Sequence, residues 1–422
     1  MSKPDPIHLP GTTLEGGGQL LRIAIGLSAL TSTPIHISSI RGNRSGGGGL
    51  KLQHLMGVKW LAKACGASTA GAEKGSKTLQ FWLQEPAYDG LIFKRQHEKA
   101  VMERTIDIGS PGAVGLVFQA ILPYLLFSGH GEGDEEEEFF VTIKGGTNVG
   151  MSPSIDYIQQ VLLPVLKLIG LPPITAKLHH RGWSTGRNEI GAVTFGVTPL
   201  RKGSCLPAFF LNERGDVITI TATVLAPSST KKDVHKEVEK QTREAFGAEA
   251  ELNINFEDSY HAKRLYILLV ATTTTSLHFG RDYLYDRKIT SYDDAIPKLV
   301  AKAVAEVKRE LDNGGSCVDE YMRDQLSVFQ MLARGRSEVF GGLVGQEGGL
   351  VEGSLHARTA WWVGREMLGV VFGGGGACEG AGFVVGEGFV RREKVSGGVD
   401  GGVSDGDEDL GVVIERLSME DT

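Results

Sequence analysis

The chain has 422 residues, 41% of them hydrophobic, a length that allows a full buried core and suggests two or three domains. It has no run of roughly 18 apolar residues, no signal peptide and no C-x-x-C pair among its four cysteines, so we expect a soluble intracellular protein with reduced thiols. The net charge of −7 excludes a protein that coats long nucleic acids. However, 11 acidic residues lie in residues 132–138 and 400–409, and the rest of the chain has a charge of +4, so it can bind a few phosphates.

The first part of the chain predicts a glycine-rich turn that leads into a buried helix. Residues 15–18 contain one carboxylate, Glu15, and three glycines, and they precede an almost wholly apolar run at residues 23–30. Free backbone N–H groups at such a helix start favour an anion, and the carboxylate could hold a metal ion that bridges phosphates. A tight turn without a ligand explains the pattern equally well.

A loop with two arginines follows the first predicted strand. The strand covers residues 34–40, and Arg41 and Arg44 come directly after it among glycines. The planar guanidinium matches the oxygens of a phosphate, although a surface loop with solvated charges is the equal alternative. A helix at residues 52–65 then ends at Gly66.

A second unit of the same kind begins near residue 105, with an apolar helix at residues 114–127. Gln119 lies inside that helix, and a buried amide needs partners, more often from the backbone than from a bound base or phosphate. A strand at residues 139–144 follows, and Pro153 precedes another helix with one apolar face. Because strand, glycine-rich turn and helix recur, we expect repeated α/β units.

Residues 197–287 differ in pattern from the chain before them. Their periodicities predict three strands, at residues 217–224, 250–256 and 265–273, and a helix at residues 232–246. We therefore expect a small inserted α/β domain within a larger domain made of residues 1–196 and 288–422.

Polar groups and a histidine mark the last third of the chain. After a helix at residues 291–311, Tyr321 can stack on a base, and Asp324 and Gln325 can form hydrogen bonds, although a solvated helix face is the simpler interpretation. His356 begins another helical run. An imidazole with an ordinary pKa of about 6.5 has an unprotonated nitrogen near pH 7 that can attack phosphorus, although a lone histidine more often packs or caps a helix.

The end of the chain is rich in glycine. Residues 341–406 contain 21 of the 58 glycines, and this composition predicts a flexible insertion at residues 373–409. A closing strand is expected at residues 412–414.

Five segments together resemble, in order, the RNA 3′-terminal phosphate cyclases. They are residues 15–19 with Arg22, residues 39–44 followed by residues 53–55, residues 144–148 with Pro153, residues 319–326, and Leu355 with His356. The resemblance covers nearly all of the chain outside the acidic loop and the glycine-rich tail. It implies an α/β (α+β) fold of three repeated units, each a four-stranded sheet with two helices, as in enolpyruvyl transferases, plus the small inserted domain.

The resemblance also implies a reaction. ATP adenylates an enzyme histidine, AMP passes to an RNA 3′-phosphate, and the neighbouring 2′-hydroxyl displaces AMP to leave a 2′,3′-cyclic phosphate. ATP and a divalent metal ion, Mg²⁺ or Mn²⁺, are then the cofactors, and an RNA 3′-phosphate end is the partner. The expected compartment is the nucleus, with the cytoplasm as a second location, and no membrane is involved.

The resemblance assigns roles to individual residues. His356 matches the adenylated histidine, and Glu15 matches a metal-linked carboxylate at the nucleotide site. The other positions of the ATP site are Gln119, Pro153, Tyr321, Asp324 and Gln325. The positions that would contact phosphates or RNA are Arg22, Arg41, Arg44 and Gln53.

Some positions depart from the family pattern, and a non-catalytic function is the main alternative. Pro10 stands where the family has Asp, Leu52 replaces a basic residue, and the family's Pro-x-Gly-Gly-Gly turn survives only in part at residues 182–188. These changes concern RNA binding and rate more than adenylation. The alternative is a cyclase-like protein that binds RNA or protein partners in ribosome (18S rRNA) biogenesis; such relatives lack the histidine and the Asp-Gln pair that this chain keeps. An enolpyruvyl transferase is a weaker alternative, because it gives no reason for the cyclase-type segments.

Overall fold

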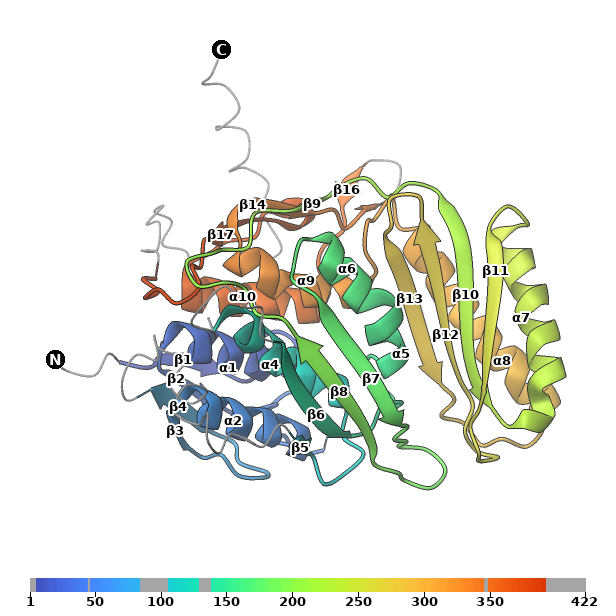
Figure 1. Cartoon of the computed structure of the whole chain (residues 1–422), viewed down its shortest axis with the longest axis horizontal. Helices are drawn as coiled ribbons and strands as arrows, with labels where there is room; N and C mark the ends of the chain where they lie inside the picture. The colour runs from blue at the N-terminus through green and yellow to red at the C-terminus, as the bar shows by residue number, and fades with distance from the viewer. Residues whose placement is uncertain (1–4, 45, 84–104, 129–137, 345–347, 392–422) are drawn as a thin grey trace, which may run out of the picture.

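The computed structural model describes residues 5–44, 46–83, 105–128, 138–344 and 348–391. These residues form a mixed α/β architecture, as predicted, with four sheets of three or four strands, one two-stranded hairpin, and helices packed between and beside them (Figure 1). In the described part of the chain, no helix is long and apolar enough to span a bilayer.

The first unit alternates strands and helices. Its elements are β1 (Ile7–Pro10), α1 (Gln19–Thr31), β2 (Ile35–Ser38), α2 (Leu52–Cys65), β3 (Ala67–Ala70) and β4 (Leu79–Leu83). The sheet order is β1-β2-β4-β3, with β1 and β2 parallel and the other pairs antiparallel. All but one of the residues of α1 are buried, since the helix is apolar on nearly every side. It therefore lies in the middle of the molecule.

The second unit has the same topology. Its elements are β5 (Thr105–Asp107), α4 (Val114–Phe127), β6 (Phe139–Gly145), α5 (Ile155–Tyr157), η1 (Ile158–Leu162), α6 (Leu163–Leu168), β7 (Ile174–His180) and β8 (Gly191–Val197). The order β5-β6-β8-β7 repeats the first sheet, again with the first pair parallel and the others antiparallel. The expected recurrence is thus visible in these two units.

The third sheet is smaller. Its unit consists of β9 (Phe210–Leu211), α9 (Glu320–Leu332), β14 (Arg334–Val339), α10 (Leu355–Leu368), η3 (Gly374–Gly376) and β17 (Ala377–Ala381), with the hairpin β15 (Leu343–Val344) and β16 (Gly349–Leu350) before α10. Its order is β17-β14-β9, with β9 and β14 parallel. A single bridge between Phe372 and Cys378 occupies the position that a fourth strand has in the first two sheets. The described residues therefore contain three of the four expected strands.

The glycine-rich segment differs from the flexible insertion predicted at residues 373–409. Residues 377–381 form β17, which pairs in register with β14, and Cys378 is buried. A Cβ at Gly380 would meet the backbone oxygens of Ala333 and Gln330, so this glycine allows close packing rather than mobility. The prediction is wrong for this strand. Residues 392–409, the predicted strand at residues 412–414 and most of the acidic loop lie outside the described residues.

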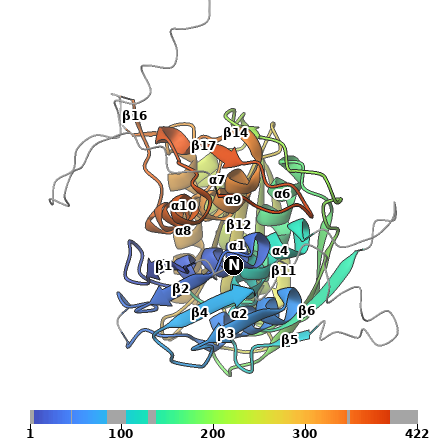
Figure 2. The same ribbon diagram turned by 90° about the vertical axis from the view of Figure 1, so that its left-hand side faces the viewer.

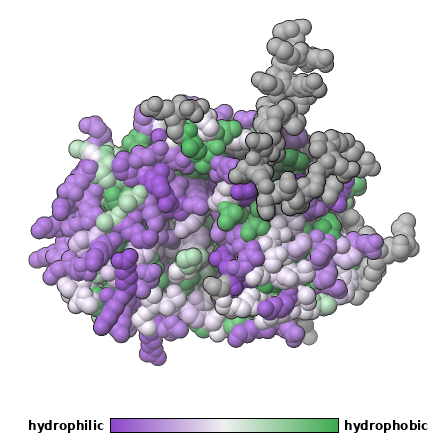
Figure 3. Space-filling model, turned by 180° about the vertical axis from the view of Figure 1, so that it is seen from behind, coloured by the Kyte–Doolittle hydropathy of each residue, from purple (hydrophilic) through white to green (hydrophobic). Residues whose placement is uncertain are grey.

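A fourth sheet is formed by the stretch between β9 and α9. Its elements are β10 (Val217–Ala226), η2 (Ser228–Thr230), α7 (Lys231–Phe246), β11 (Glu251–Asp258), β12 (Tyr266–Thr273), β13 (His278–Leu284) and α8 (Tyr292–Leu311), with sheet order β11-β10-β12-β13. The sequence assigned α8 to the larger domain, but it packs on β12, β13 and α7, so this block continues to Leu311 (Figure 1). The outer face over α7 and α8 is mostly hydrophilic (Figure 3).

Several helices, among them α1, α9 and α10, lie in the middle of the molecule (Figure 2). The first and third sheets lie on opposite sides of α1, α9 and α10 (Figure 2), and α1 contacts α2, α4 and α10. In the first two sheets the helices follow the ends of two parallel strands, so their N-termini lie at one edge of each sheet. The packing brings these N-terminal ends toward those of α9 and α10. The functional site lies at those ends.

Candidate active site

One pocket contains every residue that the sequence assigned to a site. Its cavity volume is about 570 Å³, within the range of small-molecule sites. The predicted residues on its wall are Glu15, Arg22, Arg41, Arg44, Gln53, Gln119, Pro153, Tyr321, Asp324, Gln325 and His356. The structure thus brings together residues that are up to 341 positions apart in the chain.

The pocket is built from helix starts. Its wall includes residues from the first turn of a helix, or from just before it, for α1, α2, α4, α5, α9 and α10. A helix N-terminus has free N–H groups and a partial positive charge that favour an anion. Three arginines and Lys51 add full positive charges to the same wall. The electrostatics therefore suit a ligand with several phosphates.

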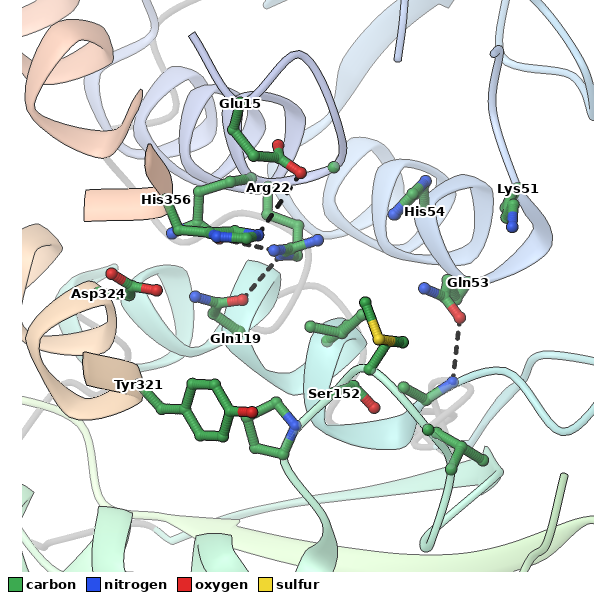
Figure 4. A pocket seen from close by; sticks show the side chains of 18 of the residues that line it. Glu15, Arg22, Lys51, Gln53, His54, Gln119, Ser152, Tyr321, Asp324 and His356 are labelled. Atoms are coloured by element: carbon green, nitrogen blue, oxygen red, sulfur yellow. Dashed lines mark hydrogen bonds and ion pairs between the residues drawn. The ribbon is translucent and has the colours of Figure 1, made fainter. Parts of the chain in front are cut away.

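His356 lies in the first turn of α10 with its imidazole toward the pocket (Figure 4). Its Nε2 is 3.5 Å from Oε1 of Glu15, and its side chain is 43% exposed. Burial lowers the pKa of His356 below the ordinary 6.5, although the carboxylate of Glu15 opposes the shift. The imidazole is therefore mostly neutral near pH 7, and a neutral ring has one unprotonated nitrogen that can act as a nucleophile.

Glu15 is buried beside the imidazole. Its Oε2 accepts a hydrogen bond of 2.8 Å from the N–H of Gly17, and its Oε1 forms an ion pair with Arg44. A side chain on Gly17 would collide with this carboxylate, which explains a glycine at that position. The glycine-rich turn therefore fixes a carboxylate rather than simply ending a strand.

Arg22 and Gln119 form the middle of the wall (Figure 4). The Nε–H of Arg22 donates to Oε1 of Gln119 at 2.7 Å, and its Nη2 donates to Oε1 of Gln19 at 2.6 Å. Gln119 is half-buried rather than buried, and its side-chain oxygen accepts from an arginine instead of from the backbone. Burial lowers the pKa of Arg22 to about 10, so it keeps its charge at pH 7. Two glutamines hold this cation in place.

Unpaired polar atoms line the same part of the pocket. Among the described residues, neither Nδ1 of His54 nor Nε2 of Gln19 has a hydrogen-bond partner, although both atoms are buried. Burial, and then the nearby Arg22, lower the pKa of His54 to about 3, so this histidine is neutral. Buried polar atoms are normally satisfied, so these two are suited to meet a ligand or an ordered water. Both residues belong to segments that resemble the family, but the sequence analysis assigned no role to either of them.

Tyr321 is held by neighbours from two other elements. Its ring packs edge-on against Tyr157 at 5.8 Å between centroids, and the guanidinium of Arg281 lies 4.2 Å from its centroid. Arg281 belongs to β13 and also forms ion pairs with Glu310 and Glu320. The fourth sheet thus supports an aromatic side chain of the pocket, a contact that the sequence did not predict.

Asp324 faces the pocket from the same helix, α9. Burial raises its pKa to about 7, and Oδ1 accepts a hydrogen bond of 2.6 Å from Ser354, which lowers the pKa in turn. Ser354 is the N-cap residue of α10, two positions before His356. Asp324 is therefore linked directly to the helix that carries the histidine.

The opposite end of the pocket is basic. Figure 4 shows Lys51, Gln53 and His54 across the cavity from His356 and Tyr321, with Arg22 between the two groups. Oε1 of Gln53 accepts a hydrogen bond of 3.0 Å from the N–H of Ala113, which ties α2 to the start of α4. The cavity thus has an imidazole end and a basic end.

The carboxylates of the pocket are compatible with a metal ion that is bound partly by phosphates. In the part of the chain that the structure describes, no three His, Cys, Asp or Glu side chains form a metal-binding group. Glu15 is, however, buried next to His356, and Mg²⁺ commonly uses one or two carboxylates together with waters and substrate phosphates. Oε1 of Glu15 forms an ion pair with Arg44, so a metal ion bound in this mode would replace Arg44 as the partner of that oxygen.

The comparisons with known proteins decide the family. A family model described as RNA 3′-terminal phosphate cyclase matches residues 13–373. The chain belongs to the RNA 3′-terminal phosphate cyclase family. The match contains all five resembling segments, so the resemblance inferred from the sequence is confirmed.

Relatives in this family come from distant organisms. The RNA 3′-terminal phosphate cyclase of Caldivirga maquilingensis is 31% identical over 79% of this chain and 86% of its own length. The one of Nostoc punctiforme is 32% identical over 79% of this chain and 88% of its own length. A probable RNA 3′-terminal phosphate cyclase of Dictyostelium discoideum is 28% identical over 88% of this chain and 78% of its own length.

Proposed function

We propose that this family member is an ATP-dependent RNA 3′-terminal phosphate cyclase that works through a covalent histidine–AMP adduct. The observation that carries the proposal is the neutral imidazole of His356, placed 3.5 Å from the buried Glu15 in a pocket made of helix starts and arginines. The named relatives support the same reaction. A non-catalytic RNA-binding role would give no reason for a nucleophile at this place.

The first step is attack of His356 on ATP. An unprotonated ring nitrogen forms a bond to the α-phosphorus, the bond to the pyrophosphate oxygen breaks, and pyrophosphate leaves. Arg22 and the helix starts stabilise the charge on the phosphates. A divalent ion held by Glu15 and the phosphates would neutralise further charge on the leaving group.

The next steps transfer AMP to RNA and close the ring. An oxygen of the RNA 3′-phosphate attacks the phosphorus of the adduct and frees His356. The 2′-hydroxyl then attacks the activated 3′-phosphate, loses its proton and displaces AMP. Because this hydroxyl is already adjacent, effective molarities of roughly 10⁵ M or more apply and no further nucleophile is required. Lys51, Arg41 and Gln53 are suited to hold the RNA end at the basic end of the pocket.

We assign the nucleotide to the imidazole end. Tyr321 is suited to stack on the base, Pro153 adds an apolar contact on the same wall, and Gln119, Asp324 and Gln325 offer polar groups to ATP. We further propose that the three main sheets are repeats of the kind found in enolpyruvyl transferases, within a larger domain that the fourth sheet interrupts. The RNA substrate class suggests the nucleus as the compartment.

We expect purified protein with ATP and Mg²⁺ or Mn²⁺ to convert an RNA 3′-phosphate into a phosphatase-resistant 2′,3′-cyclic end. Thin-layer chromatography of the nuclease-digested, 3′-labelled RNA measures the product. An RNA whose last nucleotide is 2′-deoxy is the matched control, because it can be adenylated but not cyclised. Binding of RNA without either product, under conditions where a control cyclase is active, would favour the non-catalytic alternative.

The rate of adduct formation is expected to fall at acidic pH. Only the neutral imidazole attacks, and burial lowers the pKa of His356, so the rate should be constant above pH 7 and decline with a midpoint below 6.5. Single-turnover rates measured between about pH 5 and pH 8 test this. Asp324, with a pKa of about 7, ionises in the same pH range. The rates of Asp324→Asn are therefore measured in parallel, to separate the ionisation of Asp324 from that of His356. A rate in both proteins that still rises above pH 7 would contradict the assignment.

A further inference from the structure

Two hydroxyl groups connect the first turn of α10 to both sides of the pocket. The first is that of Ser354, the N-cap residue. Its Oγ accepts a hydrogen bond of 3.0 Å from the N–H of Ala357 and donates one of 2.6 Å to Oδ1 of Asp324 on α9. An N-cap hydroxyl usually satisfies only its own helix. Here the same hydroxyl also connects the helix start to a buried carboxyl of a neighbouring helix.

The second hydroxyl belongs to Thr359, which is completely buried. Its Oγ1 donates to the carbonyl oxygen of Leu355 at 2.6 Å and accepts a hydrogen bond of 3.1 Å from the N–H of Glu15. The glycine-rich turn that carries Glu15 is therefore attached to the turn of α10 that carries His356. These two residues form the contact of 3.5 Å in the pocket.

The loop before α10 is held by the same neighbouring helix. Nη1 of Arg323 donates to the carbonyl oxygens of Val351 and Glu352, at 3.0 and 3.2 Å. The guanidinium of Arg323 also lies 5.4 Å from the ring centroid of Trp361 on α10. Arg323 of α9 thus holds the loop before α10 in place. The hydroxyls of Ser354 and Thr359 then fix the first turn of α10, which contains His356.

We propose that Ser354 and Thr359 are positioning residues that hold His356 for attack on the α-phosphorus of the nucleotide. The inference rests on the proposed function and extends it to two residues with no part in the chemistry. The hydroxyl of Ser354 links the start of α10 to Asp324, and the hydroxyl of Thr359 links the same turn to Glu15. The two hydrogen bonds thus fix the position of His356 relative to both walls of the pocket. Reactive atoms must come within roughly 3 to 3.5 Å, and a displacement of about 1 Å can slow a reaction by about 10²-fold.

The test compares substitutions that remove each hydroxyl with substitutions that keep it. Ser354→Ala and Thr359→Val remove the hydroxyl at similar volume, whereas Ser354→Thr and Thr359→Ser retain it. We expect the first pair to slow adduct formation at saturating ATP by roughly 10- to 10²-fold, with little change in the half-saturating ATP concentration. The second pair should recover most of the rate. A thermal melt of each variant shows whether it is folded at the assay temperature.

A measurement without turnover separates this inference from the proposed function. Crystal structures of the nucleotide-free proteins measure the distance between Nε2 of His356 and Oε1 of Glu15, which is 3.5 Å in wild type. We expect this distance to change by roughly 1 Å in Ser354→Ala and Thr359→Val, enough to slow the reaction, and to stay the same in the conservative variants. If the distance is identical in all variants, or if the rate loss does not depend on the hydroxyl, the positioning role is wrong. If wild type forms no adduct but the imidazole is displaced in the two variants that lack a hydroxyl, the proposed function fails and the positioning role stands.

Discussion

Replacement of His356 by alanine is expected to abolish the protein–AMP adduct and, with it, cyclisation. The imidazole supplies the nucleophile, and no other histidine on the pocket wall can replace it, because the ring of His54 is buried and lies at the basic end. Incubation with ATP labelled at the α-phosphate, followed by denaturing electrophoresis, measures the adduct. We expect a loss of at least several orders of magnitude, down to background.

A matched control is available on the surface. His179 lies on the exposed face of β7, outside the pocket, where its Nε2 contacts the hydroxyl of Thr194. His179→Ala should label like wild type. Labelling of His356→Ala at the wild-type level would mean that another residue carries AMP, and the mechanism proposed for this pocket would be wrong.

Replacement of Arg22 by alanine is expected to slow adduct formation by roughly 10² to 10³-fold, the usual effect of removing one preorganised donor at a centre of developing charge. Arg22 remains cationic because its pKa, although lowered by burial, is about 10. Gln19 and Gln119 fix its orientation through two hydrogen bonds, so its charge is in place before ATP binds. Single-turnover labelling at saturating ATP measures the effect.

The control for Arg22 must separate charge from packing. Arg22→Lys retains the charge but cannot make both hydrogen bonds in the same geometry, so an intermediate rate is expected. Arg336→Ala, on an exposed part of β14, should have no effect on the rate. Equal rates for Arg22→Ala and wild type, with both proteins folded in a thermal melt, would exclude Arg22 from the phosphate site.

The sequence predicted the apolar helices well, and the candidate site residues that it indicated lie together in one pocket. Residues 114–127 and 52–65 form helices at the expected positions, because their apolar runs and terminating residues leave little choice of structure. All eleven predicted site residues line one pocket, because many of them lie at or just before helix starts and the fold brings these starts together. The roles of the individual residues remain to be tested by the experiments above.

The sequence could not predict features that depend on distant contacts. Arg281 reaches Tyr321 from the fourth sheet, and no local pattern marks an arginine that will lie over a ring 40 positions away. The short strands β9 and β17 carry too few residues for a clear alternation. Glycines around Gly380 indicate flexibility by composition, whereas the structure uses Gly380 where backbones approach closely. The apolar face of α8 could pack against either neighbouring domain, so its sequence does not show to which domain it belongs. Its contacts with α7, β12 and β13 do.

Identification of the residue that carries AMP tests the central claim most directly. Wild-type protein labelled with ATP and a divalent metal ion is digested at neutral or alkaline pH, because a phosphoramidate is labile in acid, and the modified peptide is sequenced by mass spectrometry. We predict a single site of AMP attachment at the imidazole of His356. AMP on any other residue, or no covalent AMP while cyclic phosphate is being formed, would contradict a mechanism in which His356 is the nucleophile.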